Sequence, residues 1–210
     1  MSDPVRVLRY GDRALLAELD GTAAAVSYAE VLRSAGLEHV DDLVPGARTV
    51  LVVAGPRADL DTLTVRMREL RPEPETEPSD DADTIEIGVR YDGPDLEAVA
   101  ELTGLSADEV VRAHTGTPWR VAFGGFSPGF AYLSGGDERL AVPRRDEART
   151  KVPVGSVGLA GEFSGVYPSA SPGGWQLIGS TEQVMWDLER DPPALLRPGA
   201  WVRFVDEGRS

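Results

Sequence analysis

The segment from Arg71 to Asp83 constrains the fold more than any other part of the chain. It reads RPEPETEPSDDAD and is almost free of apolar side chains. Such a segment cannot bury enough surface to offset the entropy lost on ordering, so we expect a solvated linker. It predicts two folded parts: an N-terminal α+β domain at residues 1–70 and a second domain at residues 84–210, with the linker at 71–83.

The first domain combines strand and helix patterns. The expected elements are strands at 5–10 and 14–19, a helix at 22–35, strands at 40–44 and 49–53, and a helix at 59–70. The run from Thr49 to Val53 is continuously apolar, which is typical of a buried strand. The order predicts a small α+β sandwich with the helices on one face of a sheet.

The second domain begins with a strand at 85–91 and two short helices at 95–102 and 107–114. Ser106 and Glu109 have the spacing of a capping box at the start of the second helix. Gly and Pro then recur between short apolar runs at 119–123, 157–160 and 201–205. This spacing of Gly and Pro residues indicates a compact β-barrel with long, structured loops. With the first domain, the predicted fold class of the chain is α+β.

Composition excludes several kinds of function. The formal net charge of −14 disfavours binding to nucleic acid or to anionic membranes. No apolar run reaches the roughly 18 residues of a membrane span, and the N-terminus lacks a signal-peptide layout, so we expect a cytoplasmic protein. Without cysteine and with two histidines, the chain offers no thiol nucleophile or zinc–thiolate site, and we expect no metal.

A glycine-rich loop is the densest candidate for a binding site. It contains Gly124, Gly125, Phe126, Pro128 and Gly129. Glycines allow the backbone to approach a ligand closely, and successive N–H groups in such a loop can hold an anion or an oxyanion. A tight barrel turn with phenylalanines in the core would give the same composition.

Four cations cluster shortly after this loop, at Arg144, Arg145, Arg149 and Lys151. Arginine pairs in bidentate fashion with carboxylate or phosphate, so the cluster can hold one anionic group. It could equally be a solvated basic loop that pairs with the protein's own acids. The turn Ser171–Trp175 presents an aromatic ring that either forms the wall of a pocket or anchors a hairpin.

His114 is the candidate acid or base. It lies at the C-terminal end of its predicted helix, where the helix dipole favours the protonated ring. A structural role at the helix end is the alternative. Ser127 and Ser156 stand beside glycines, but neither belongs to a recognised nucleophile motif, and no phosphate-binding loop occurs. The set is incomplete for an enzyme, so a second chain is expected to supply part of it.

Read together, the motifs resemble one family, that of the B-type subunit of 5-oxoprolinase and KipI, whose members are also labelled as the first subunit of allophanate hydrolase. The matching strings are HT (114–115), VAFGGFSPGFAYL (121–133), LAVPRR (140–145), VPVGSVGLAG (152–161), VYP (166–168) and SPGGWQLIG (171–179). Their order and spacing cover nearly all of the second domain.

The resemblance implies a cyclophilin-like β-barrel and a KipA-like partner, the C-type subunit. It also implies a LamB/YcsF-like A-type subunit and ATP, used by the assembled complex to open 5-oxo-L-proline to L-glutamate. Two other activities occur among relatives of this kind. One is the hydrolysis of allophanate or urea-type amides, or carboxyl transfer to them. The other is KipI-like inhibition of a histidine kinase.

The resemblance also assigns roles to residues. It implies proton transfer by His114. The expected contacts to a small amide or lactam are Gly124, Gly125, Phe126, Pro128, Gly129, Arg144, Arg149, Ser156 and Trp175. Three positions depart from the family pattern: Trp119 replaces a common tyrosine, Ala148 a proline and Ser180 an arginine. The last change removes a cation from a signature segment and bears on the substrate.

Overall fold

The chain folds as two compact units, each described here by itself. The computed structural model describes residues 5–73 and 84–208. The division between the units falls inside the predicted linker, of which residues 74–83 lie outside the described ranges.

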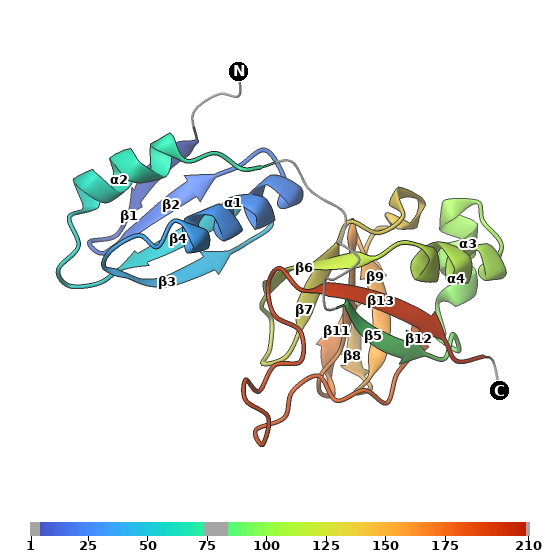
Figure 1. Cartoon of the computed structure of the whole chain (residues 1–210). Coiled ribbons are helices and arrows are strands. Elements are labelled where there is room, and N and C mark those ends of the chain that lie inside the picture. Colours follow the sequence, from blue (N-terminus) through green and yellow to red (C-terminus); the bar gives the residue numbers. More distant parts are fainter. Residues whose placement is uncertain (1–4, 74–83, 209–210) are drawn as a thin grey trace. The chain divides into compact units, whose positions relative to one another are not determined.

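The first unit is a four-stranded antiparallel sheet with two helices (Figure 1). Its elements are β1 (Arg6–Tyr10), β2 (Ala14–Glu18), α1 (Thr22–Ser34), β3 (Val40–Pro45), β4 (Thr49–Ala54) and α2 (Leu60–Glu69). The strand order is β1-β2-β4-β3. The elements agree with the expected ones to within two residues at either end.

One face of this sheet carries the core. Val52 and Leu15 lie opposite each other in register and are both fully buried. They belong to the same cluster as Tyr28 of α1 and Met67 of α2, so both helices cover this face. Burial alternates along β4, so its apolar run is covered fully on one side only, unlike the expected buried strand.

The second unit is built on a seven-stranded sheet with the order β12-β9-β10-β7-β6-β13-β5. Its elements are β5 (Thr84–Val89), α3 (Leu96–Thr103), α4 (Ala107–Gly116), β6 (Trp119–Gly124), β7 (Ala131–Ser134), the 3-10 helix η1 (Glu138–Leu140), β8 (Arg149–Val152), β9 (Ser156–Ala160), β10 (Phe163–Val166), β11 (Ser171–Gly173), β12 (Gln176–Ser180) and β13 (Trp201–Asp206).

Backbone contacts join the two ends of this sheet. Arg90, just after β5, and Ser180, at the end of β12, exchange two backbone hydrogen bonds of 2.8 Å. The approach requires glycine at position 179, because a Cβ there would lie 2.5 Å from the Arg90 carbonyl oxygen. The sheet therefore curls into a nearly closed barrel, and the expected α+β fold with a barrel is confirmed.

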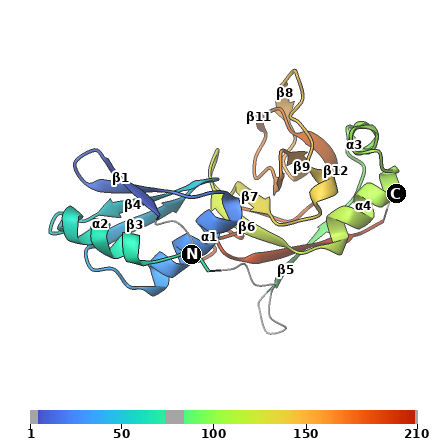
Figure 2. The same ribbon diagram turned by 90° about the horizontal axis from the view of Figure 1, so that it is seen from above.

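The helices α3 and α4 lie side by side next to the barrel (Figures 1 and 2). The predicted capping box is present: Ser106 Oγ accepts from the Glu109 N–H, and the Glu109 carboxylate accepts from the Ser106 N–H. α4 packs against β13 and α3 against β12, so both helices contribute to the barrel core.

A second apolar layer covers the outer face of β9, β10 and β12. It consists of Phe130, Val152, Ala160, Tyr167, Trp175 and Leu177, with Tyr132 and Phe163 packed against them. The two-stranded ribbon of β8 and β11 adjoins this layer. Because neighbouring side chains on a strand point to opposite faces, this layer is separate from the barrel core.

Candidate functional site

A small cavity opens beside the outer aromatic layer, and we call it the aromatic cleft. Its volume is about 110 Å³, and it is lined by Phe126, Phe130, Tyr132, Arg144, Tyr167, Gly173, Gly174 and Trp175. These residues come from the glycine-rich loop, the basic segment and the SPGGW turn. The fold thus brings together three segments that the sequence marks separately.

The walls of the cleft are aromatic rings that meet edge to face. The centroids of Phe130 and Trp175 are 5.3 Å apart at 88°, and those of Phe130 and Tyr167 are 5.3 Å apart at 74°. Gly165 lies beneath them: a Cβ there would be 3.1 Å from both Phe130 and Trp175. The absence of a side chain at this position lets the rings pack against the strand, so the cleft has a rigid wall.

Phe126 at the rim has a strained backbone. The N–H of Ser127 donates to the Gly125 carbonyl at 2.8 Å, and Phe126 between them has φ of 68°. This is the rare γ-turn with positive φ, in which a non-glycine residue is strained. The ring of Phe126 is 60% exposed and lies 5.4 Å from the Phe130 ring. Strain of this kind is typical of ligand clamps.

The same loop offers fewer free backbone donors than its composition indicates. Gly125 donates to the Phe130 carbonyl and Ser127 to that of Gly125, while Pro128 has no N–H. Among the residues that the structure describes, Phe126 and Gly129 are the loop positions from 125 to 129 whose N–H groups have no acceptor. An oxyanion at this loop would therefore meet at most these two donors.

Arg144 supplies the charge at the cleft. It is exposed and has no ion-pair or hydrogen-bond partner within residues 5–73 and 84–208. Burial raises the pKa of Tyr167, while a hydrogen bond with the Trp175 backbone and the positive charge of Arg144 act in the opposite direction. The phenol stays neutral at physiological pH, so the cleft combines one unpaired cation with a tyrosine hydroxyl.

The other two arginines of the basic segment are occupied. Arg145 Nη1 and Arg149 Nη2 each donate to Asp95 Oδ1 at 2.7 Å, and the Leu177 N–H donates to Asp95 Oδ2 at 2.7 Å. Burial alone would raise the pKa of Asp95, but the bonds from Arg149 and Leu177 and the two positive charges hold it below its usual value. The carboxylate is therefore charged. It forms an ion pair with Arg149, the residue that was predicted to bind the substrate.

His114 is enclosed in the barrel core. Its ring is 0% exposed, Nδ1 lies 2.7 Å from the Tyr91 hydroxyl, and Nε2 lies 2.8 Å from Ser164 Oγ. The ring stacks on Phe204 at 4.2 Å. Desolvation lowers its pKa to about 3. The expectation that the helix dipole favours a protonated ring is wrong here, because burial dominates, and these contacts do not support direct proton transfer by His114.

One strand separates His114 from the aromatic cleft. Ser164, which contacts His114, and Gly165, which underlies the aromatic rings, are consecutive residues of β10 and face opposite sides. The structure thus does not bring His114 and Arg144 into one site.

The remaining predicted residues have separate places. Ser156 is buried at the start of β9 and does not line the cleft. Gly124, Gly125, Pro128 and Gly129 belong to the loop that carries Phe126, whereas Trp175 is a wall of the cleft. Ser180 donates its hydroxyl to Asp92 at 2.9 Å and also does not line the cleft.

Two residues of this region were missed as site residues by sequence reasoning. Tyr167 lies in the VYP string, and its aromatic type beside a proline was its only signal. Asp95 stands at the start of a helix and resembles an ordinary N-cap, although its side chain makes no capping hydrogen bond. Its partners lie 50 and 54 residues later, so no local pattern identifies them.

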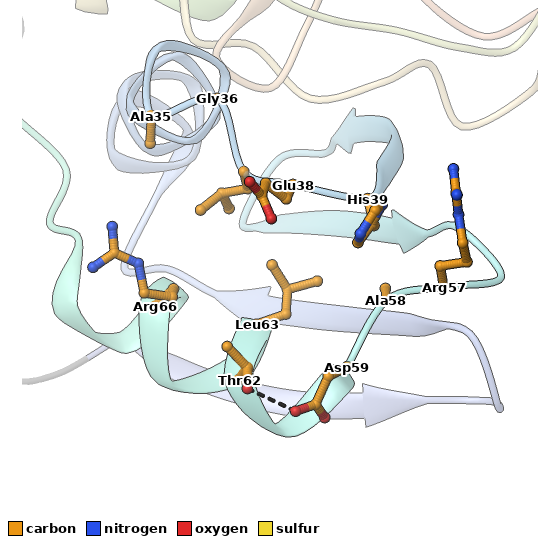
Figure 3. A pocket seen from close by; sticks show the side chains of 11 residues that line it. Ala35, Gly36, Glu38, His39, Arg57, Ala58, Asp59, Thr62, Leu63 and Arg66 are labelled. Atoms are coloured by element: carbon orange, nitrogen blue, oxygen red, sulfur yellow. Dashed lines mark hydrogen bonds between the residues drawn. The ribbon is translucent and has the colours of Figure 1, made fainter.

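A larger cavity of about 460 Å³ lies in the first unit (Figure 3). Its polar lining includes Glu38, His39, Arg57, Asp59 and Arg66. Asp59 caps α2 by accepting from the Asp61 N–H, so a carboxylate already occupies the helix end that would otherwise attract a phosphate. The cavity lies outside the sequence motifs and is less suited to an anion than the aromatic cleft.

No group of three or more His, Asp or Glu side chains in residues 5–73 and 84–208 is arranged to hold a metal ion. Within the same ranges, the helices are too short or too polar to cross a membrane.

Comparison with known proteins gives a consistent result. Residues 5–196 match the family model described as "Carboxyltransferase domain, subdomain C and D". The chain is 41% identical over 206 residues to the B-type subunit of 5-oxoprolinase from Escherichia coli O157:H7, covering 94% of both chains. It is 48% identical over 124 residues to the Bacillus subtilis (strain 168) protein of the same name, covering 58% of this chain and 52% of that one.

Solved structures show the same architecture. TTHA0988 is 33% identical with a TM-score of 0.74, and the match covers 94% of this chain but only 40% of that one. The conserved uncharacterized protein PH0987 from Pyrococcus horikoshii is 37% identical with a TM-score of 0.58, covering 96% and 98% of the two chains. Urea carboxylase of Kluyveromyces lactis, at 19% identity and a TM-score of 0.69, shares the fold over 99% of this chain and 22% of its own. The chain therefore belongs to the family of B-type 5-oxoprolinase subunits, which are built from carboxyltransferase-type domains.

Proposed function

We propose that this chain is one component of an ATP-dependent 5-oxoprolinase complex that opens 5-oxo-L-proline to L-glutamate in the cytoplasm. The aromatic cleft with its unpaired Arg144 is the observation that carries the proposal. The identity of 41% over nearly the whole length of a curated B-type subunit supports it.

The cleft has the chemistry that a small anionic lactam needs. Its volume of about 110 Å³ is well below the roughly 300–1,000 Å³ of drug-sized sites, so it suits a ligand of few heavy atoms. Aromatic edges can contact a flat five-membered ring, and the Arg144 guanidinium can hold its carboxylate.

The loop at Phe126 would act on the lactam carbonyl. Ring opening breaks the amide C–N bond, the hydroxyl of water adds to the carbonyl carbon, and the nitrogen takes up a proton. The free N–H groups of Phe126 and Gly129 can stabilise negative charge on the carbonyl oxygen. We assign no chemical step to His114, because a fully buried ring cannot reach the ligand.

The residues around the cleft do not fit ATP. A cavity of about 110 Å³ is too small for a nucleoside triphosphate. Its lining holds one arginine, and the loop at its rim lacks the sequence motif of a phosphate-binding loop at the start of a helix. ATP and the groups that activate the amide would belong to partner chains, which we propose to be a KipA-like C-type subunit and a LamB/YcsF-like A-type subunit.

A second candidate is carboxyl transfer to, or hydrolysis of, a urea-type amide. The description of the matching family model favours it. A neutral urea has no carboxylate, so it would leave Arg144 without a ligand group. The charge at the cleft therefore favours the acidic lactam.

Reconstitution tests the proposal. The chain is combined with the C-type and A-type homologues of the same genome, and glutamate release from 5-oxo-L-proline is measured with and without ATP, omitting each component in turn. We expect ATP-dependent release that requires this chain. Turnover of urea or allophanate without turnover of 5-oxo-L-proline would instead establish the second candidate.

A further inference from the structure

The segment between β12 and β13 forms a projecting ribbon, residues 182–196, which we call the arm (Figure 1). The Asp187 N–H donates to the Pro193 carbonyl at 3.1 Å, and the Leu195 N–H donates to the Met185 carbonyl at 2.9 Å. The arm thus consists of turns and bends held by these bonds around one antiparallel bridge, between Trp186 and Ala194.

The arm carries apolar side chains on both of its faces. Met185 is 2% exposed and joins the barrel core. Val184, Trp186 and Leu188, at alternate positions, are 54%, 37% and 82% exposed. Apolar side chains scattered singly over a surface are ordinary, but three exposed ones within five residues are typical of a surface that another molecule covers. The outer face of the arm thus has the composition of a covered surface.

The arm lies against the glycine-rich loop at the rim of the aromatic cleft. A Cβ on Gly129 would lie 2.7 Å from the Trp186 Cβ, so the glycine-rich loop packs directly against the arm. Phe126, in the same loop, adds a ring that is 60% exposed. Together with the apolar side chains of the arm it places several exposed apolar groups beside a cavity, which marks an interaction site.

We propose that the strip of Phe126, Val184, Trp186 and Leu188 is the docking surface for one partner, the C-type subunit of the proposed complex, which covers the cleft. This inference rests on the proposed function for the identity of the occupant. The curated relatives are named as subunits. This chain also covers only 40% of TTHA0988, where the remaining polypeptide is covalently attached to the equivalent domains.

The charges around the strip define the chemistry of the occupant. Asp187, Glu189 and Asp191 lie among the apolar positions, whereas Glu182 before them is paired with Arg90 at 3.1 Å. The cation among them, Arg190, donates to the carbonyl oxygens of Val184 and Pro193 and so is held against the arm. The partner surface is therefore an apolar groove with a basic rim, and its association weakens as salt rises.

The test uses the full chain and the polypeptide of the same genome that aligns with the uncovered portion of TTHA0988. The double variant Trp186→Ser/Leu188→Ser is compared with the wild type by isothermal titration calorimetry. We expect affinity to fall at least about tenfold, because central aromatic and aliphatic residues dominate interfaces. The matched control is Val65→Ser on α2 of the first unit, which is 55% exposed and should leave affinity unchanged.

The outcomes separate this inference from the proposed function. Unchanged affinity in the double variant, with an unchanged melting temperature, would overturn the docking surface, and glutamate release by the wild-type complex would then still stand. Failure of the wild-type chain to bind the partner at all would overturn it as well. Binding lost in the double variant, in a complex that never releases glutamate, would support the surface and reject the reaction.

Discussion

Asp95 and Arg149 form an ion pair of 2.7 Å between the start of α3 and strand β8, 54 residues apart in sequence. The Asp95 side chain is 4% exposed and also binds Arg145 and the Leu177 N–H. This one carboxylate connects the basic segment to α3 and β12. Arg144, the first residue of that segment and the neighbour of Arg145, is thereby held at the cleft.

Asp95→Asn should destabilise the second unit. The neutral amide leaves two partly buried guanidinium groups without a counter-charge, and removing one partner of a buried pair typically costs about 3–5 kcal/mol. Since both arginines keep some exposure, we expect about 2–3 kcal/mol, measured as the free energy of unfolding in urea. Glu182→Gln, which removes an exposed pair with Arg90, should cost below about 1 kcal/mol. Equal effects of the two variants would contradict this account of Asp95.

His114 should make stability depend on pH below neutrality. Its pKa is about 3 in the folded state, against an ordinary value of about 6.5 when unfolded. The unfolded chain therefore binds a proton between these values and the folded chain does not. The neutral, buried His114 ring therefore costs no stability above about pH 6.5. Below that value the free energy of unfolding should fall by about 1.4 kcal/mol per pH unit until about pH 3.

The variant His114→Phe isolates this effect. It removes hydrogen bonds to Tyr91 and Ser164 and should be less stable near neutral pH. Between about pH 6.5 and about pH 5, the free energy of unfolding of the variant should nevertheless fall by about 2 kcal/mol less than that of the wild type. Urea unfolding at the two pH values measures it, and an identical loss in both proteins would show that His114 is protonated in the folded state.

Phe126→Gly should separate stability from ligand binding. Glycine accepts the positive φ without strain, which offsets its greater flexibility, so the free energy of unfolding should stay within about 1 kcal/mol. Loss of the ring should raise KM for 5-oxo-L-proline by about tenfold in the assembled complex. Phe126→Ala keeps the backbone strain and removes the ring, so it should show the same KM with lower stability. A normal KM in both variants would exclude Phe126 from the site.

Local patterns predicted the helices of the first unit and the combination of an α+β sandwich with a β-barrel. Apolar periodicity located α1 and α2, and Ser106 with Glu109 marked the start of α4. The strands around the cleft were missed because their composition is that of loops. β10 contains Gly165, required by the rings above it, and β11 is only Ser171–Gly173.

The candidate site was predicted in part. The GFSPGF, PRR and SPGGW strings do meet at the cleft, because the Arg145 N–H donates to the Gly174 carbonyl and the Phe130 ring packs on Trp175. The roles of His114 and Arg149 depend on partners distant in sequence. Ser164 and Phe204 enclose the histidine, and Asp95 binds the arginine. Burial and ion pairing across such separations follow from the closed barrel and are not encoded in any short motif.

The most direct test concerns the charge at the cleft. Binding of 5-oxo-L-proline and of 2-pyrrolidinone, the same ring without the carboxylate, is measured by calorimetry on the assembled complex, for the wild type and for Arg144→Gln. A charge-assisted hydrogen bond of about 1.5–3 kcal/mol predicts that the wild type prefers 5-oxo-L-proline by about tenfold to a hundredfold. Arg144→Gln should lose this preference, and the exposed Arg203→Gln should keep it. If Arg144→Gln retained the full preference, the aromatic cleft would not be where the substrate carboxylate binds.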